Sequence, residues 1–271
     1  KPIEPVFLDY QKDMSQLKAK SDIPVLYKQN VANDLFQLIY VFDMGNNHDK
    51  ALGTAFDYLE YLGTSDMTPE ELKSEFYRLA CTFYVSPGNE RTYVVLSGLN
   101  ENMPAAMQLF EKLLADAQVN KEAYNNLVGD ILKARADAKL NQGQNFSRLM
   151  NYAMYGPKSP ATNLLTEAEL ASMNPQELVD RIHNQNNYKH RILYYGPSSS
   201  KDLLATIEQY HQVPATLKDI PAGNEYSYLE TPATKVLVAP YEAKQIYMAQ
   251  ISNLDKKYDP AIEPTRELYN E

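Results

Sequence analysis

The sequence predicts an α+β fold, in which helices cover a largely antiparallel sheet. Strand-like and helix-like segments come in blocks rather than in strict alternation, and the turn-rich stretch 86–90 joins two strand-like segments as a hairpin. Residues 24–40 can also be laid over residues 235–251 without gaps, so that Val25 meets Val236. A strand, a turn, a second strand and a helix therefore occur twice, which indicates repeated structural units.

The composition indicates a globular protein and argues against two classes of partner. The chain has 271 residues, of which 44% are apolar, and its net charge is −9. Lys and Arg never form a cluster longer than a pair, so we expect no binding to nucleic acid or to anionic membrane surfaces. Apolar runs stay short of the ~20 residues that a membrane span needs. The composition does not indicate the compartment. If the chain comes from a bacterium, we expect it to be soluble and to lie in the periplasm or the cytoplasm.

Four segments are expected along the chain. Residues 1–22, which include the extended-looking Pro5–Tyr10, form a lead-in strand or linker. Residues 23–210 form a complete α+β unit, residues 211–232 form a linker with several Pro and Gly, and residues 233–271 begin a second repeat unit. Because the last segment stops within a predicted helix and without a cap, we expect the sequence to be part of a longer chain.

Two β-rich runs open the complete unit, and a helix follows them. The runs Ile23–Tyr27 and Leu35–Phe42 are separated by Asn and Asp residues, which is typical of a hairpin. The second run is apolar on both faces and is therefore expected inside the sheet. Residues 49–64 have apolar side chains at three- and four-residue spacing and end near Gly63, which favours a capped helix with one buried face.

Capping signals and apolar periodicity predict the remaining elements. Thr68-Pro-Glu-Glu71 combines a Thr N-cap, a Pro at the first helical position and a Glu that completes a capping box, and Thr166 opens a similar box. Asn120 can cap a long helix. The predicted helices cover about 68–79, 104–114, 120–138, 146–155, two short segments from 166 and from 174, and 202–210; the predicted strands cover 80–85, 92–99 and 190–195.

From about Pro5 onward the chain resembles the insulinase and pitrilysin-type zinc peptidases. The resemblance is carried by the order of elements and by five short stretches, which are Leu62-Gly-Thr64, Glu70–Phe76, Cys81–Ser86, Leu96–Leu99 and Tyr152–Pro157. It implies helices on a sheet, as in the units of insulinase and mitochondrial processing peptidase. It also implies a parent peptidase of four related units in two halves around a chamber, with this chain similar to the third unit and the start of the fourth.

The resemblance places a degenerate metal motif on the helix within 49–64. In the family this helix carries His-x-x-Glu-His, in which two His bind zinc and the Glu activates water. The motif positions fall on residues 54–58, where Thr54 and Tyr58 replace the two His and Asp57 replaces the Glu. The third ligand position falls on Asp130. Since zinc prefers imidazole, thiolate or carboxylate ligands, we expect no catalytic residue, metal or cofactor in this chain, and zinc in the other half of the parent protein.

The two aspartates, the cysteine, the tyrosines and the histidines could each have a functional or a purely structural role. A weak oxygen site, formed by Asp57 and Asp130 with outside ligands, is a minor alternative. Cys81 lies in an apolar run and is expected to be buried, and as the single cysteine it forms no internal disulfide. The 21 Tyr residues could line a peptide-binding surface or simply belong to strands and core. The four histidines are expected to be surface or hydrogen-bonded residues rather than metal ligands, with His48 and His211 isolated in polar loops; the other two are His183 and His190.

The sequence therefore predicts the noncatalytic half of a zinc metalloendopeptidase. Its partners would be the catalytic half of the same polypeptide and a peptide or unfolded protein substrate, which it would bind along an exposed strand edge. The parent chain would hydrolyse peptides, whereas this part alone would be inactive. The alternative is a structural or assembly scaffold of the same fold with no substrate role.

Overall fold

The computed structural model describes residue 7 and residues 9–242, 244–253 and 259–270. The chain forms two compact units: unit 1 lies within residues 1–133 and 163–224, and unit 2 lies within residues 134–162 and 225–271. These boundaries differ from the predicted unit 23–210, because residues 134–162 associate with the C-terminal part of the chain. Most of the predicted extended stretch Pro5–Tyr10 lies outside the described residues.

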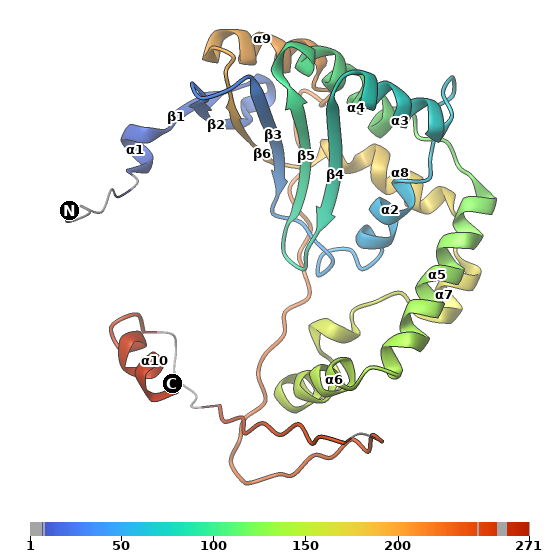
Figure 1. Ribbon diagram of the computed structural model, residues 1–271, viewed down its shortest axis with the longest axis vertical. Helices are drawn as coiled ribbons and strands as arrows, with labels where there is room; N and C mark the ends of the chain where they lie inside the picture. Colours follow the sequence, from blue (N-terminus) through green and yellow to red (C-terminus); the bar gives the residue numbers. More distant parts are fainter. Residues whose placement is uncertain (1–6, 8, 243, 254–258, 271) are drawn as a thin grey trace. The chain divides into compact units, whose positions relative to one another are not determined.

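Unit 1 is built on a sheet that has six strands among the described residues, in the order β1-β2-β6-β3-β5-β4 (Figure 1). The strands are β1 (Ser15–Lys18), β2 (Pro24–Gln29), β3 (Leu35–Phe42), β4 (Cys81–Pro87), β5 (Thr92–Leu99) and β6 (Arg191–Gly196). Neighbouring strands are antiparallel except β2 and β6, which are parallel. The predicted α+β class and the predicted interior position of β3 are confirmed, and β1 shows that the lead-in belongs to the sheet.

The predicted hairpin between the first two β-rich runs is wrong, because β6 lies between β2 and β3. Leu193 of β6 is opposite Leu26 of β2 on one side and opposite Ile39 of β3 on the other. The Asn-rich connection does reverse the chain, but it also binds the inserted strand, since Asn30 N–H donates to the carbonyl oxygen of Gly196 at 2.8 Å. Turn residues specify a reversal of direction, and they do not specify which strand fills the space between the two runs.

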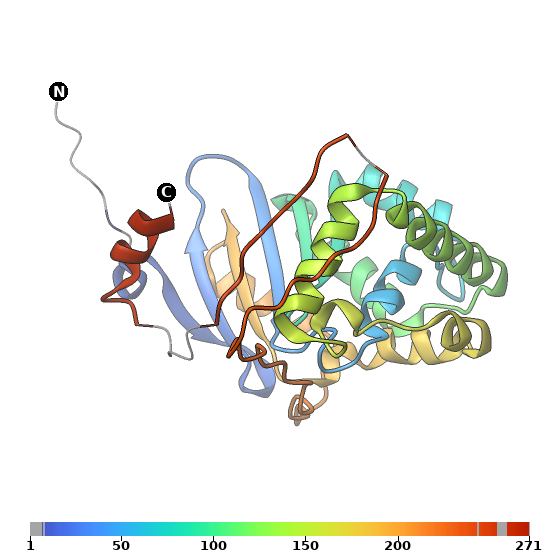
Figure 2. The same cartoon turned by 90° about the horizontal axis from the view of Figure 1, so that it is seen from below.

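Helices cover one face of the sheet, as Figure 2 shows. They are α2 (Leu52–Leu59), α3 (Pro69–Arg78), α4 (Met103–Asp116), α8 (Gln176–Asn184) and α9 (Ser200–Tyr210). Unit 1 also contains α7 (Glu167–Ser172) and the part of α5 (Lys121–Lys139) up to Lys133. Its shorter segments are α1 (Tyr10–Asp13) and the 3-10 turns Lys20–Asp22, Asn100–Asn102 and Gln185–Asn187, whereas the turn Pro160–Thr162 belongs to unit 2. Both predicted capping boxes form, at Thr68 and Thr166. Asn120 caps α5 as predicted, because its Oδ1 accepts from Ala123 N–H at 3.0 Å.

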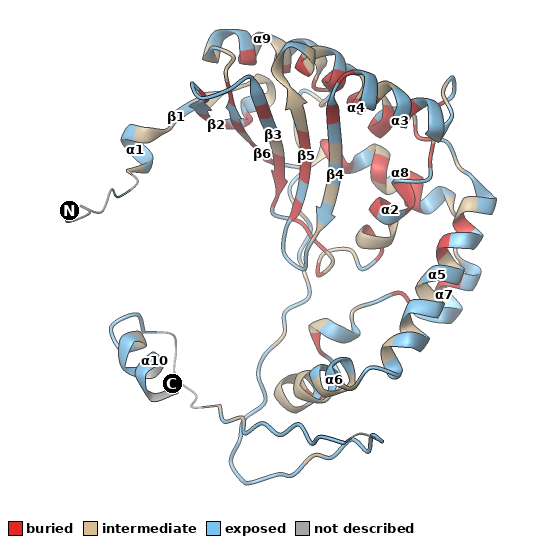
Figure 3. Cartoon of the chain, in the orientation of Figure 1, coloured by how far each residue is buried: buried red, intermediate tan, exposed pale blue. Residues whose placement is uncertain are grey.

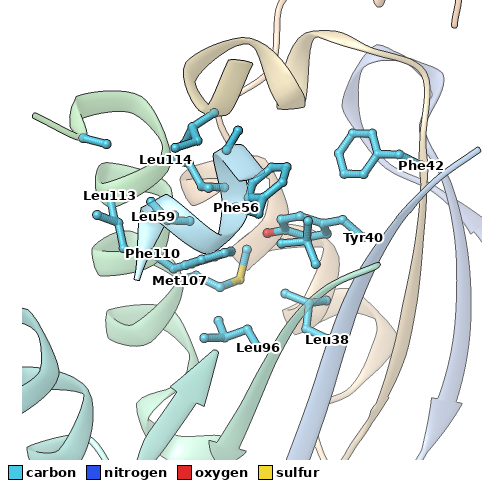
Figure 4. Close-up of a cluster of buried hydrophobic side chains, with 14 of the residues drawn as sticks. Leu38, Tyr40, Phe42, Phe56, Leu59, Leu96, Met107, Phe110, Leu113 and Leu114 are labelled. Carbon is cyan, nitrogen blue, oxygen red and sulfur yellow. The ribbon is translucent and has the colours of Figure 1, made fainter. Parts of the chain in front are cut away.

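The hydrophobic core lies between the sheet and these helices. Alternate residues of β3 point into it, and Figure 4 shows Leu38 and Tyr40 facing Phe56 of α2 and Phe110 of α4. The burial colouring of Figure 3 shows the same concentration of buried residues where the helices meet the strands. Cys81 is buried as predicted, and burial raises the pKa of its thiol. The apolar layer between sheet and helices therefore fixes the register of every strand that contributes to it.

Unit 2 contains α6 (Gln142–Tyr155) and α10 (Glu263–Asn270). Gly156 caps α6 at φ +76°, a conformation that favours glycine. Leu229 N–H donates to the carbonyl oxygen of Met154 at 2.7 Å, so the chain around Leu229 contacts the C-terminal end of α6. Residues 233–242 and 244–253 form no strand, and the predicted second repeat stays a prediction. None of the helices described in either unit has the length and apolar character of a membrane span.

Leu38→Ala tests the buried layer. Leu38 is 1% exposed at the centre of β3, so the substitution removes apolar contacts and leaves a cavity, and we expect the free energy of unfolding to fall by about 3 kcal/mol in urea denaturation. Leu35→Ala is the matched control on the opposite face of the same strand, where Leu35 is 54% exposed, and a loss below about 0.5 kcal/mol is expected. Equal losses for the two variants would contradict this assignment of faces.

Candidate functional site

Tyr58 of α2, which the sequence resemblance aligns with the second zinc-binding His of the family, makes structural hydrogen bonds. Tyr58 is buried, and its hydroxyl donates to the carbonyl oxygen of Asn120 at 2.6 Å and accepts from the N–H of Asn120 at 2.9 Å. Its ring meets the ring of Tyr124 edge-on at 5.8 Å. The phenol therefore fastens α2 to the first turn of α5, the helix on which the third ligand position falls.

The other motif positions do not complete a metal site. Thr54 is half-buried, whereas Asp57 and Asp130 are exposed. Partial desolvation raises the pKa of Asp57, and repulsion from Glu60 adds to this effect. The ionised form of this carboxyl, which a metal ion would need, is therefore less favoured than in an ordinary Asp. Asp130 comes six residues after the Tyr124 that contacts α2, which places it about 9 Å farther along α5 and on another face of the helix.

These residues do not fit zinc. The hydroxyl oxygen of Tyr58 is occupied by the backbone of Asn120, and the structure does not bring Asp130 to the α2 contact. Among the residues that the structure describes, no three His, Cys, Asp or Glu side chains are grouped as metal ligands. No catalytic step can therefore be derived at the motif positions.

Strand β4 forms one edge of the sheet among the described strands (Figure 1). Ala80 accepts a hydrogen bond from Leu99 N–H at 3.2 Å, and Gly88 donates to Arg91 at 2.7 Å, so even-numbered residues face β5. Odd-numbered residues therefore direct their backbone groups to the free edge. These are Cys81, Phe83, Val85 and Pro87. Pro87 has no N–H, and its carbonyl oxygen accepts from Nδ2 of Asn46 at 3.4 Å.

An apolar hollow of about 620 Å³ lies at the start of this edge strand. It is lined by Leu35, Phe36, Tyr77, Ala80, Cys81, Thr82, Ser97 and Gly98. Tyr77 of α3 is 87% exposed at this hollow, which is unusual for a large aromatic side chain. Gly98 has φ +151°, and a Cβ atom there would lie 2.4 Å from the carbonyl oxygen of Ala80. Glycine is therefore required where β5 approaches the start of β4.

A buried polar network in the core was not predicted from the sequence. Glu111 of α4 is 1% exposed and His211 is 0% exposed, and Nδ1 of His211 lies 2.6 Å from Oε1 of Glu111. Nε2 of His211 lies 2.9 Å from Nε2 of His190. The hydroxyl of Tyr40 donates to the same Oε1 at 2.9 Å. Burial and the negative charge of Glu111 raise the pKa of Tyr40 well above its usual value, so the phenol stays protonated.

The expectation that His211 is isolated in a polar loop is wrong. One signal was present in the sequence, because helical spacing places Glu111 on the apolar face of α4 between Met107 and Leu114. A carboxylate on such a face requires partners, although the sequence does not name them. The expectation of hydrogen-bonded histidines is confirmed for His190, and His183 contacts the carbonyl oxygen of Ala117 at 3.1 Å.

Comparisons with known proteins identify the fold. The structure resembles the periplasmic protease PqqL from Escherichia coli with a TM-score of 0.71 and 15% identity, over 83% of this chain and 26% of that chain. It resembles a mutant of the ferredoxin protease FusC, solved in complex with Arabidopsis ferredoxin, with a TM-score of 0.68 and 12% identity, over 83% of this chain and 25% of that one.

A third solved structure is an inactive domain of a peptidase of family M16 from Pseudomonas fluorescens, with a TM-score of 0.65 and 16% identity, over 79% of this chain and 54% of that chain. No family model and no curated protein matches the sequence. The chain spans about a quarter of the length of the first two structures. The fold is therefore that of insulinase and pitrilysin-type peptidase units, which confirms the predicted resemblance at the level of the fold.

Tyr58→Phe tests the structural role of the motif position. The substitution keeps the ring and leaves the N–H of Asn120 without its partner, whereas the carbonyl oxygen of Asn120 still accepts from Tyr124 N–H at 3.0 Å. We therefore expect the free energy of unfolding to fall by about 1–3 kcal/mol. Tyr61→Phe, on the exposed side of the same region, is the control and should change it by less than about 0.5 kcal/mol. Thermal and urea unfolding measure both, and an unchanged stability in Tyr58→Phe would refute the fastening role.

Proposed function

We propose that this chain is a noncatalytic, substrate-holding part of a zinc metalloendopeptidase, and that it holds extended peptide along the free edge of β4. The observation that carries the proposal is the combination of unpaired backbone groups on β4 with an apolar hollow beside them. The fold supports a peptidase setting, and the residues at the motif positions support a role other than hydrolysis.

The β4 edge suits an added strand. Cys81, Phe83 and Val85 would exchange backbone hydrogen bonds with an extended peptide, which is a mode that reads the backbone and tolerates many side-chain sequences. An apolar side chain of that peptide would enter the hollow beside Tyr77. Pro87 would end the pairing, because it offers no N–H at the far end of the strand.

The zinc-bearing half would lie elsewhere in the parent polypeptide and would perform the hydrolysis. The ferredoxin protease FusC was solved with a protein bound, which supports a peptide or protein ligand for a unit of this fold. In the rival proposal the chain is a structural or assembly scaffold. The two proposals differ in whether the β4 edge binds peptide.

Val85→Pro tests the edge. The substitution removes an outward N–H, and Pro is tolerated at an edge strand where the N–H faces solvent. We expect the affinity for a short unstructured peptide with a central Leu, measured by isothermal titration calorimetry, to fall about fivefold, which corresponds to the loss of one net hydrogen bond of about 1 kcal/mol. N-methylation of alternate peptide nitrogens should weaken binding similarly.

Gln16→Pro is the matched control at the opposite edge of the sheet. Ala19 N–H donates to Ile23 at 2.9 Å, so odd residues of β1 face β2 and Gln16 faces outward. Its substitution should leave the peptide affinity unchanged. If Gln16→Pro alone weakens binding, the site lies on β1 instead; if the unmodified protein binds no peptide, the scaffold proposal takes its place.

A further inference from the structure

Three titratable side chains lie in a row in the core of unit 1. Nδ1 of His211 lies 2.6 Å from Oε1 of Glu111, and the Nε2 atoms of His211 and His190 are 2.9 Å apart. Nδ1 of His190 lies 2.7 Å from the carbonyl oxygen of Tyr188. All three side chains are buried, so each of these three contacts needs a hydrogen between its two atoms.

The number of protons in the row follows from these contacts. A carbonyl oxygen only accepts, so Nδ1 of His190 must carry a hydrogen. The two Nε2 atoms need one hydrogen between them, and the contact of His211 with Glu111 needs another. The row therefore holds three protons, whereas a carboxylate and two neutral imidazoles hold only two. One extra proton makes the row neutral overall, whether it sits on His211 or on Glu111.

The remaining contacts favour His211 as its carrier. Oε1 of Glu111 accepts from Tyr40, and Oε2 accepts from Nδ2 of Asn186 at 2.9 Å and from Gln212 N–H at 3.1 Å. Four donors around two oxygens suit an ionised carboxylate. Burial and repulsion by His211 lower the pKa of His190 to about 4, which keeps His190 neutral.

We propose that Glu111, His211 and His190 form a site that binds one proton when the chain folds, and that this proton holds segment 211–218 on unit 1. The segment begins at His211, and its Gln212 N–H donates to Glu111. Farther on, Lys218 N–H donates to Asn187 at 2.8 Å. Without the extra proton, two lone pairs face each other at one of the three contacts in the row. That contact then separates, and the start of the segment loosens.

Other charged and titratable groups face the row from the elements packed against it. They are Tyr40 from β3, Tyr188, Lys20 before β2, and His183 from α8. Lys20 donates to the carbonyl oxygen of Glu208 at 2.8 Å, and His183 contacts Ala117, so each has its own partner. A cavity of about 450 Å³, lined by Lys20, His183, Asn186, Glu111 and His211 among others, adjoins the row.

The proton content fixes the sign of the pH dependence. Unfolded histidines titrate near pH 6.5. Above this pH the unfolded chain holds two protons on the three groups and the folded chain holds three, so stability falls as the pH rises and the unfolding constant grows up to tenfold per pH unit. Below it the unfolded chain holds four, so stability also falls as the pH drops toward about 4, where His190 becomes protonated. The contribution of the row is therefore largest near pH 6.5.

His190→Phe and Tyr40→Phe form the test pair. Urea unfolding from pH 5 to 8 should show a maximum in the unmodified protein. In His190→Phe only Glu111 and His211 remain, and a neutral His211 can donate its single proton to the carboxylate. The folded and the unfolded chain then hold the same number of protons above pH 7. The slope of the logarithm of the unfolding constant against pH should therefore be lower by about one than in the unmodified protein between pH 7 and 8. Tyr40→Phe removes a hydrogen bond to the same carboxylate without changing the proton count, so it should lower stability and keep the slope. Equal slopes in His190→Phe and the unmodified protein would overturn the proposal.

A second measurement needs no variant. Calorimetric unfolding of the unmodified chain at pH 7.5, in phosphate and in Tris, yields the number of protons released from the difference in enthalpy between the buffers. We expect about one proton per chain, since unfolded thiols such as that of Cys81 ionise mainly above pH 8. Release of none would overturn the proposal.

Hydrogen exchange tests whether the row anchors segment 211–218. The protection of the Gln212 amide, relative to that of the Leu38 amide, should fall between pH 6.5 and 9. Unchanged relative protection would refute the anchoring.

Discussion

The burial of one face of the central strand β3 is the constraint on which the rest of unit 1 depends. Leu38, Tyr40 and Phe42 point from this strand into the layer between sheet and helices. Because the side-chain period of a strand is two, this burial fixes the register of β5 and β6 on either side. The same layer buries the hydroxyl of Tyr40 and the carboxylate of Glu111, and their mutual hydrogen bond is stronger there than it would be in water.

The motif helix shows how a metal-site position can become part of a core. Tyr58 provides apolar area on α2 and one hydroxyl that satisfies both backbone groups of Asn120. The phenol ties the two helices together by hydrogen bonds and needs no metal ion to do so. The contact between α2 and α5 is therefore compatible with the proposed holding function on this fold.

Local signals predicted local structure well. The capping residues Thr68, Thr166 and Asn120 were read correctly because a cap is satisfied by atoms within three or four residues. The β2–β3 hairpin was predicted wrongly because the intervening β6 comes from a distant part of the chain. His211 was misplaced for the same reason, since its partner Glu111 is 100 positions away.

The candidate site on β4 depends on similar long-range information. The sequence predicted the strand, but an edge is defined by the absence of a neighbour, which a strand's own residues do not encode. The direction of its backbone groups follows from contacts at both ends of the strand, at Ala80 and Gly88. The hollow likewise combines residues from β3, α3, β4 and β5, so it could be found only once these elements were placed in space.

Pro87 lowers the tendency of the protein to aggregate through its edge strand. An open strand border is a template on which like molecules can stack into fibres. Pro87 offers no N–H at one end of the β4 edge, and the β4–β5 hairpin is expected to be strongly twisted. Both features shorten the part of the edge that could pair with a strand of a second molecule. If the β4 edge binds peptide as proposed, Pro87 would leave room for one extended peptide and would disfavour pairing with the same edge of a second copy of this chain.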